Sequence, residues 1–432
     1  MLNEPFIQSQ TGLIRSIIIM LILKNLYAFY IKFCSIKAMS IYYKTLVSSV
    51  LVVFASIGLG RFSYGMILPD LQRSLDISTT QAGFISTANF IGYLIAIFFV
   101  SFLYKKYETY RLVCSSLFLQ AISMMGMVLF SNYLVISFFY TFSGFFAALA
   151  NVSIMIYIAH IIPSHMKGKA LGIAVTGIGF GIIFSGFIVP QIEAVVQSSA
   201  WKVSWTVFAV LVLLISFFAK AGLQQHDKLQ HNNQPEKKSK EILVSLKFYK
   251  VAFLYLVFGI TYVVYVTFFV TASIDKYNIS SYEAGYFWSV LGTMSLFSGP
   301  IFGHFSDKIG GYKTLIIIFT FLTIANLILA LNLGSNFLWV SAVLFGLSAW
   351  AVPSLITLLS SQEFGVQNTA KVFSLATLLF STGQAIGPFV AGYMYDLKGD
   401  FSIVFLICSG ITTSAIVASF IFSLNAQKDV NL

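Results

Sequence analysis

The sequence predicts an all-α integral membrane protein with about twelve transmembrane helices in two six-helix bundles. Two observations predict this class, the composition and a long internal repeat. Of the 432 residues, 58% are hydrophobic and only 9% are charged, against about 25% charged in an ordinary soluble domain. A soluble fold of this size could not cover that much apolar surface with polar groups, whereas a bilayer accepts apolar side chains that face outward.

Successive apolar runs, each near the ~20 residues that cross a bilayer, define the expected helices. In the first half they lie at 45–69, 79–103, 112–130, 133–162, 170–192 and 201–219. In the second half they lie at 251–274, 283–305, 314–333, 337–360, 372–395 and 401–424. A polar stretch at 224–247 separates the halves and is typical of a solvated linker. The expected organisation is an N-terminal extension, a first bundle, a cytoplasmic linker, a second bundle and a cytoplasmic tail, at 1–44, 45–221, 222–248, 249–425 and 426–432.

Lysine and arginine are distributed unevenly over the two sets of connections between these helices. With the residues before Thr45 placed in the cytoplasm, 21 of the 26 basic residues are cytoplasmic, and the outer side receives Arg73, Lys202, Lys276 and Lys398. The positive-inside rule then predicts that both termini are cytoplasmic, here in a bacterial inner membrane. The net charge of +11 does not indicate a nucleic-acid partner, because the basic residues lie in short connections and form no aromatic-interleaved patch.

The first 38 residues have two interpretations, which the sequence leaves open. The segment 13–33 is apolar but is interrupted by Arg15, Lys24 and Lys32. A thirteenth span here would place Lys24 in hydrocarbon and would invert the topology of the rest of the chain. The segment is therefore either an interfacial helix or the result of a start codon assigned too early, with Met39 opening the protein.

The internal repeat has one gapless offset of about 202 residues. The segment QAGF at 81–84 matches EAGY at 283–286, and single residues in loops and helices match at the same offset: Gly144 with Gly346, Lys106 with Lys308, Lys169 with Lys371 and Gly181 with Gly383. Because six spans is an even number, the halves share one orientation and form parallel repeats about an axis along the membrane normal. Two such halves can rock against each other around a central site.

Two segments carry a resemblance to the major facilitator superfamily. The loop after the eighth span, GHFSDKIGGYK at 303–313, is similar to the cytoplasmic signature of that superfamily, and GLGRFSYGMILP at 58–69 resembles members of the YbfB/YjiJ type. The resemblance covers 45–424. It implies secondary transport of a small solute by alternating access, in a monomer that lies in the lipid bilayer and needs no cofactor.

The signature loop also provides the candidate gating residues. Gly303 and Asp307 are four residues apart and therefore share one helix face, and Lys308 and Lys313 follow. The resemblance implies that this loop latches the cytoplasmic gate while the outer side is open, with Asp307 opposite the start of the fifth span near Gly168. In the first half the matching loop departs from the pattern, since Lys105 stands in place of the aspartate; we expect Glu363 to provide its counter-charge.

Arg61 is the only lysine or arginine inside a predicted span. A central arginine costs about 2.5–3.5 kcal/mol on insertion scales, and the span's outer end at Pro69 is eight residues, or about 12 Å, away. Arg61 is therefore expected to face the protein interior, with Tyr64 on the same face. It is either a binding group for a small organic anion, which its forked guanidinium would fit, or one member of a structural contact.

The first, fourth, seventh and tenth spans line the central cavity in the superfamily that the chain resembles. Near their midpoints the sequence offers further candidate substrate contacts: Asn151, Tyr262, Tyr265 and Trp350. Aromatic side chains with a polar tip suit a cavity that holds an amphipathic solute, and a mid-span amide needs hydrogen-bond partners. In a sequence with 44 phenylalanines and 22 tyrosines, helix packing is the competing interpretation of each aromatic residue.

Other classes of function and site find no support in the sequence. The motifs of ATP-binding loops, serine hydrolases and zinc proteases do not occur, so no enzyme is expected. Three widely spaced cysteines, Cys34, Cys114 and Cys408, indicate no metal site. No acid lies at the middle of a span, so Glu193, near the outer end of the fifth span, is the candidate for a coupling proton. A non-transporting sensor or scaffold and a multidrug-type efflux antiporter remain open as alternative functions.

Overall fold

The computed structural model describes residues 41–162, 166–196, 199–223, 239–331 and 333–430, which contain helices and connections and no strand. The two interpretations of the first 38 residues, and the linker over 224–238, lie outside the described residues. Within the described part, the expected all-α membrane class is confirmed.

The first half contains six spans, of which the first is a composite. They are α2 (Ile41–Val53), η1 (Phe54–Phe62) and α3 (Tyr64–Leu75) as one continuous span, then α4 (Thr79–Lys106), α5 (Thr109–Leu129), α6 (Tyr133–Ile161), α7 (Lys167–Val196) and α8 (Ala200–Leu223). The second half contains the short α9 (Ser239–Leu243) and then α10 (Leu246–Tyr277), α11 (Ser281–Ile309), α12 (Gly311–Ala330), α13 (Phe337–Ala349) with α14 (Val352–Phe364), η3 (Val366–Asn368) with α15 (Thr369–Lys398), and α16 (Ser402–Val430).

Eleven helical segments of the described chain are long and apolar enough to cross a membrane. The twelfth span is α11, which is 29 residues long and packs between α7 and α13. It is less apolar than the other spans because it contains several glycines and serines and a proline. The helix α10 begins at Leu246, inside the stretch expected to be solvated, because Phe248 is buried and Lys247 pairs with Glu363 at 3.6 Å.

The repeat is visible in the helix ends as well as in the helices. Adding 202 to the start of α4 at Thr79 gives Ser281, where α11 begins. The residues Asp76 and Asn278, also 202 apart, both end their helices in the left-handed conformation at φ 50°. Ser78 and Ser280 then form the same capping box with the third residue of the next helix. The duplication therefore includes the local signals that start each helix.

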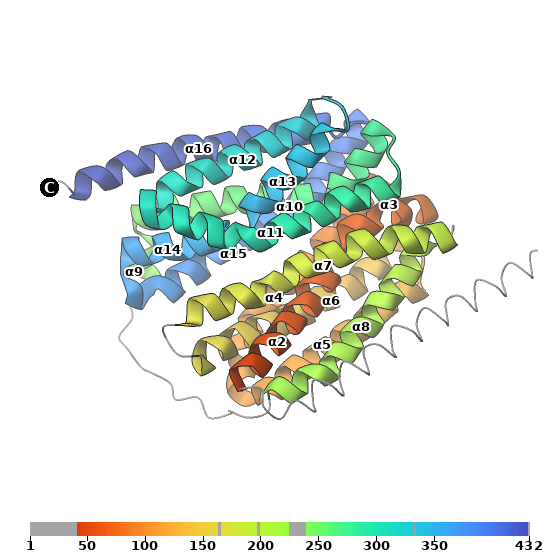
Figure 1. Ribbon diagram of the computed structural model, residues 1–432, viewed down its shortest axis with the longest axis horizontal. Coiled ribbons are helices and arrows are strands. Elements are labelled where there is room, and N and C mark those ends of the chain that lie inside the picture. The colour runs from red at the N-terminus through yellow and green to blue at the C-terminus, as the bar shows by residue number, and fades with distance from the viewer. Residues whose placement is uncertain (1–40, 163–165, 197–198, 224–238, 332, 431–432) are drawn as a thin grey trace, which may run out of the picture.

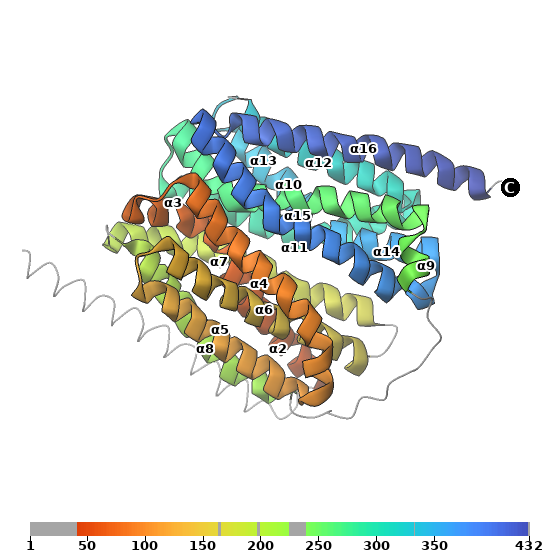
Figure 2. The ribbon, with the colours of Figure 1, turned by 180° about the vertical axis from the view of Figure 1, so that it is seen from behind.

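Figures 1 and 2 show the two halves as bundles that lie side by side, the first in red to light green and the second in green to blue. Their interface is made mainly by α4 against α15 and by α7 against α11. We call the end at which α4 and α11 begin the Asp396 end. The opposite end, at which α7 and α15 begin and α9 lies, we call the linker end.

The helices α7 and α11 meet through two rows of glycines spaced by seven residues. A Cβ on Gly186 would lie 2.7 Å from the Gly285 carbonyl oxygen, and one on Gly179 would lie 2.9 Å from that of Gly292. Such distances are shorter than real Cβ contacts, so this approach of two backbones requires glycine.

The same two rows separate toward the linker end. Gly172 and Gly299 are the next members by the seven-residue spacing, and a Cβ on either would meet nothing within 4 Å. The same is true of Gly168 and Gly303 further along. The bundles are therefore in contact over the half of the interface at the Asp396 end and separate toward the linker end, as the diverging α7 and α11 in Figure 1 also show.

Candidate functional site

The first span changes from α-helix to π-helix at its middle, and Arg61 lies in this π-helical segment, η1. The wider turn is seen in the hydrogen bond from the Ser63 amide to the Gly58 carbonyl, five residues earlier, at 3.2 Å. Side chains of other helices also bind carbonyls of this segment: Gln120 Nε2 donates to the Ser56 carbonyl at 2.9 Å, and the Tyr140 hydroxyl donates to the Arg61 carbonyl at 3.2 Å. A π-helical turn supported in this way often marks a functional site.

The guanidinium of Arg61 is held inside the first bundle by three neighbours. Its Nε donates to Asn89 Oδ1 at 3.0 Å, and Asn89 is itself oriented because its amide nitrogen donates to the Tyr140 carbonyl at 3.1 Å. The rings of Phe90 and Tyr93 lie with their centroids 4.4 and 4.1 Å from the guanidinium carbon. Arg61 is 7% exposed, so it faces the interior of the protein, as expected, and its cation is stabilised mainly by ring faces.

Two polar atoms beside this cluster are buried without a hydrogen-bond partner among the described residues. They are Nη2 of Arg61 and Oδ1 of Asn151. The other side of the Asn151 amide donates to the Tyr93 hydroxyl at 3.2 Å, and the Tyr93 ring contacts Arg61. Arg61 Nη2 and Asn151 Oδ1 are therefore an unpaired donor and an unpaired acceptor close to the same ring.

The second bundle contributes an aromatic wall to the same region. Tyr262 on α10 lies within electrostatic range of both Arg61 and Tyr93, and Gln384 on α15 donates to its hydroxyl. The Tyr262 ring stacks on the Phe380 ring, which in turn stacks on Tyr255 with 4.2 Å between the centroids of Phe380 and Tyr255. The second bundle therefore contributes hydroxyl-bearing and aromatic rings within electrostatic range of the Arg61 cation.

The other three predicted contacts have partners of their own. Tyr64 lies beside Arg61, but its hydroxyl donates to the Ala82 carbonyl at 2.7 Å. Tyr265 is enclosed in the second bundle, where it shares a hydrogen bond of 2.7 Å with Ser341 and stacks on Phe345. Trp350, between α13 and α14, has an edge contact of 5.8 Å with Phe62, the residue after Arg61. The structure thus brings together Arg61, Asn151 and Tyr262, and gives the other three packing contacts.

A small cavity of about 10 Å³ adjoins Arg61 and is lined by Tyr64, Phe90 and Tyr140 and, from the second bundle, by Val266 and Thr267. It has room for about one water molecule and none for an organic solute. Next to it the Ser86 and Thr267 hydroxyls share a hydrogen bond of 3.2 Å across the interface. On this side of Arg61 the two bundles are therefore closed.

The Asp396 end is held shut by a hydrogen-bonded contact between the halves. Asp396 on α15 accepts from the backbone amides of Thr79 and Thr80, at 3.0 and 2.8 Å, and from the Thr80 hydroxyl. These amides form the N-terminus of α4, where a negative charge is favoured by about 0.3–1 kcal/mol. On the other side of the interface Trp288 Nε1 donates to Ser185 at 3.2 Å. The closed end thus depends on specific polar contacts as well as on glycine packing.

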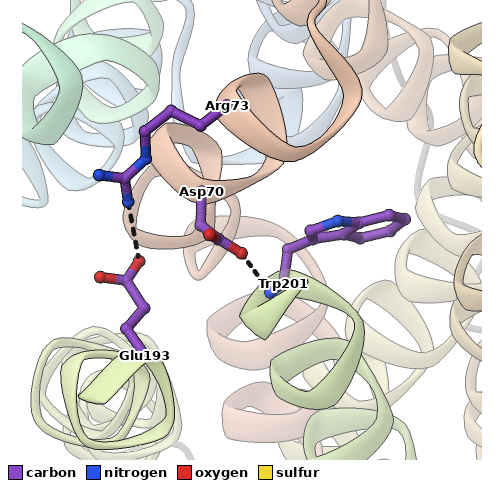
Figure 3. A network of polar contacts seen from close by, with 4 residues as sticks. All are labelled: Asp70, Arg73, Glu193 and Trp201. Atoms are coloured by element: carbon purple, nitrogen blue, oxygen red, sulfur yellow. Dashed lines mark hydrogen bonds and ion pairs between the residues drawn. The ribbon is translucent and has the colours of Figure 1, made fainter. Parts of the chain in front are cut away.

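Figure 3 shows where Glu193 lies, together with an acid that the sequence analysis did not single out. Glu193 on α7 pairs with Arg73 on α3 at 3.8 Å, and its side chain is 13% exposed. One helical turn from Arg73, the buried Asp70 accepts from the Trp201 amide at 2.7 Å and so caps the start of α8. Glu193 also interacts with Ser281 of the second bundle. The candidate proton carrier is therefore part of a charged group at the interface of the two halves.

The gating residues of the 303–313 loop are not engaged. Gly303, Asp307, Lys308 and Lys313 are exposed, and Asp307 has no hydrogen bond or ion pair with the other described residues. Its expected partner, the start of α7 near Gly168, has open space around it. Glu363 binds Lys247 and accepts from the Tyr312 hydroxyl at 2.9 Å; the side chain of Lys105, its expected partner, lies outside the described residues.

Several residues of the central cluster were not predicted, namely Asn89, Tyr93, Tyr140 and Gln384. The rule applied to Asn151, that a mid-span amide needs partners, would have selected Asn89 and Gln384 as well. Nothing in the sequence distinguishes Tyr93 and Tyr140 from the other tyrosines, because their importance comes from which helix they face.

Comparison with known proteins points to one family. Residues 53–421 match the family model described as "Uncharacterised MFS-type transporter YbfB". The putative uncharacterized transporter YgaY of Escherichia coli is 24% identical over 194 residues, which is 44% of this chain and 48% of that protein. The chain thus spans about half the length of this curated relative.

Two more similarities extend over larger parts of the chain. The multi-drug resistance efflux pump PmrA of Streptococcus pneumoniae is 25% identical over 284 residues, covering 62% of this chain and 67% of the pump. Among solved structures, a bacterial homolog to the human lysosomal transporter Spinster, in an inward-facing and unoccupied conformation, superimposes with a TM-score of 0.68 at 12% identity. It covers 91% of this chain and 99% of that one. At this identity the likeness concerns the fold alone.

Proposed function

Because the chain belongs to the MFS-type transporter family described by YbfB, we propose that it is a secondary transporter that moves a small organic anion by alternating access. The observation that carries the anion is Arg61, a buried cation at the interface of the two halves with an unpaired Nη2. A carboxylate could accept from that nitrogen, while Asn151 and Tyr262 offer hydrogen bonds to a second polar group. The stacked rings of Tyr255 and Phe380 would contact an apolar body.

The linker end is placed in the cytoplasm in this proposal, since 21 of the 26 basic residues lie on that side of the predicted topology. The closed Asp396 end then faces outward, and the bundles, separate at the linker end, are open to the cytoplasm. The unengaged Asp307 fits this state, because a cytoplasmic latch should be released when the cytoplasmic side is open. The protein works as a monomer in the bacterial inner membrane in this proposal.

The function is tested in two steps with purified full-length protein. Thermal stabilisation by small carboxylates, phosphates, uncharged analogues and organic cations first identifies the ligand class; a hit among anions only is expected. Flux of that ligand into proteoliposomes, with and without a proton gradient, then measures transport. Stabilisation by cations alone would reject the anion site. Specific binding without flux under any gradient would instead identify a sensor.

Glu193 is the acid that we propose for proton coupling. Its carboxylate lies between Arg73 of its own half and Ser281 of the other half, so its surroundings change when the halves separate. Replacing Glu193 with glutamine is expected to leave ligand exchange without a gradient near the wild-type rate and to abolish acceleration by the gradient. Gradient-driven uptake at the wild-type rate in this variant would exclude it, and Glu283→Gln, at an exposed helix cap, is the matched control.

Replacing Asp307 with asparagine is expected to slow transport about two- to fivefold without removing the protein from the membrane. The reason is that a charge near a helix N-terminus contributes about 0.3–1 kcal/mol, here in the state where the linker end is closed. Initial flux rates at equal reconstituted amounts measure the effect. Asp307→Glu, which keeps the charge, should retain most of the rate; unchanged turnover in Asp307→Asn would contradict the latch.

A further inference from the structure

The second bundle has an apolar cavity of about 360 Å³ between α10, α15 and α16, away from the central cluster. Leu256, Ile386 and Cys408 are among the residues that line it, one from each helix. Ile386, Val390 and Ile407 are exposed, so the cavity opens to the surface of the bundle. Its volume is at the small end of the range of about 300–1,000 Å³ that is typical of ligand sites.

The repeat explains why this cavity exists. In the first bundle the equivalent space is filled by a row of rings, since Phe54 contacts Phe184 at 5.8 Å between centroids and Phe184 contacts Phe208 at 6.0 Å. Adding 202 to Phe54 and Phe184 gives Leu256 and Ile386, and both of these line the cavity. The wall that α16 contributes has no ring either, since it consists of Val404, Ile407, Cys408 and Ile411.

The chemistry of the lining selects the occupant. The wall contains one hydroxyl-bearing side chain, Thr382, which donates to the Leu378 carbonyl of its own helix at 3.0 Å. Water would find no partners there and an anion no counter-charge. The helices around the cavity are membrane spans, so the medium at its mouth is hydrocarbon.

We propose that this groove is a binding site for one acyl chain of a membrane lipid. The chain takes the place of the three rings that fill the first bundle, and it supports α15 against α10 and α16. Since α15 carries Gln384 on the central cluster and Asp396 on the closed end, the bound chain holds a helix that both sites need. The proposal rests on the membrane fold and is independent of which solute is carried.

The test uses the full-length protein in liposomes doped with a phosphatidylethanolamine that bears a photoactivatable diazirine in its acyl chain. After irradiation, peptide mass spectrometry is expected to find adducts on groove residues of α15 and α16. Cys408→Phe adds a ring to the wall that α16 contributes to the groove and is expected to abolish the groove adducts. Val417→Phe, at a position of the same helix that is 53% exposed and outside the groove, is the matched control and should leave them unchanged.

A second variant protects the test against a folding failure. Ile386→Phe adds the ring equivalent to Phe184 at the exposed mouth, where strain is smaller, and is expected to reduce the groove adducts as well. Equal labelling of the groove and of the surface around Val417, unaffected by either filling variant, would show that lipid only surrounds the protein and would overturn the proposal. The proposal would also be overturned if an apolar non-lipid probe prevented the groove adducts and added phospholipid could not compete with that probe.

Discussion

Replacing Arg61 with alanine is expected to abolish transport of the anion and to weaken its binding roughly 10- to 150-fold. The reason is that a hydrogen bond from an ionised donor contributes about 1.5–3 kcal/mol, and Nη2 of Arg61 is the buried cationic donor that lacks a partner in this cluster. Binding is measured by calorimetry or thermal shift on purified protein, and transport by flux into proteoliposomes. The same variant should bind an uncharged analogue of the solute as well as wild type does.

Three further variants separate binding from support of the fold. Arg61→Lys keeps the charge but loses the forked geometry and the Nε bond to Asn89, so it should bind the anion poorly. Arg61→Met keeps the length of the side chain without the charge. Asn89→Ala removes the hydrogen bond that supports Arg61 but leaves Nη2 in place, so this variant should lose less anion affinity than Arg61→Met does. Normal anion transport by both Arg61→Lys and Arg61→Ala would show that Arg61 does not bind the anion and has only a structural role.

The features that could be predicted from the sequence depend on averages over many residues or on large energies. Hydropathy over whole spans, and a repeat that recurs at a single offset, predicted twelve helices with ends close to those observed. The cost of a charge in hydrocarbon placed Arg61 inside the protein, where it is 7% exposed. Both inferences hold without knowledge of which helix lies beside which.

The contacts of single side chains could not be predicted, because they depend on which helices are neighbours. Tyr262 and Tyr265 are separated by about 60° around α10, which is enough for one to reach Gln384 on α15 and the other Ser341 on α13. The π-helical turn at Arg61 could likewise not be predicted from the sequence. Its carbonyls accept hydrogen bonds from Gln120 and Tyr140, which are far away in the sequence.

Replacing Gly186 with alanine is expected to shift the protein strongly away from the state described here. The new Cβ would lie 2.6 Å from the Ser289 hydroxyl oxygen and 2.7 Å from the Gly285 carbonyl oxygen, and a backbone group cannot move aside without separating α7 from α11. Overpacking of this kind costs about 1–3 kcal/mol, which changes an equilibrium between two states roughly 5- to 150-fold. The population of the state closed at the Asp396 end should fall accordingly.

The matched control is the same substitution two heptads away on the same helix. Gly172→Ala meets nothing within 4 Å in this structure, and alanine favours a helix over glycine by about 0.5–1 kcal/mol. If the two halves rock, however, Gly172 should approach Gly299 when the linker end closes. The same seven-residue spacing that pairs Gly186 with Gly285 predicts this pair. Gly172→Ala should then increase the population of the state closed at the Asp396 end, which Gly186→Ala decreases.

Spin labels at Tyr107 and Val366, exposed residues of opposite halves, report the width of the linker end once the three native cysteines are replaced. Gly186→Ala should shorten the distance between the labels and Gly172→Ala should lengthen it or leave it long, while both slow transport. Opposite shifts from the same glycine-to-alanine change at two positions of α7 are expected only if the helix is rigid and packs closely at one end in one state and at the other end in the other state. If both variants instead moved the distance in the same direction, α7 would be a static packing helix, and the glycine rows would say nothing about alternating access.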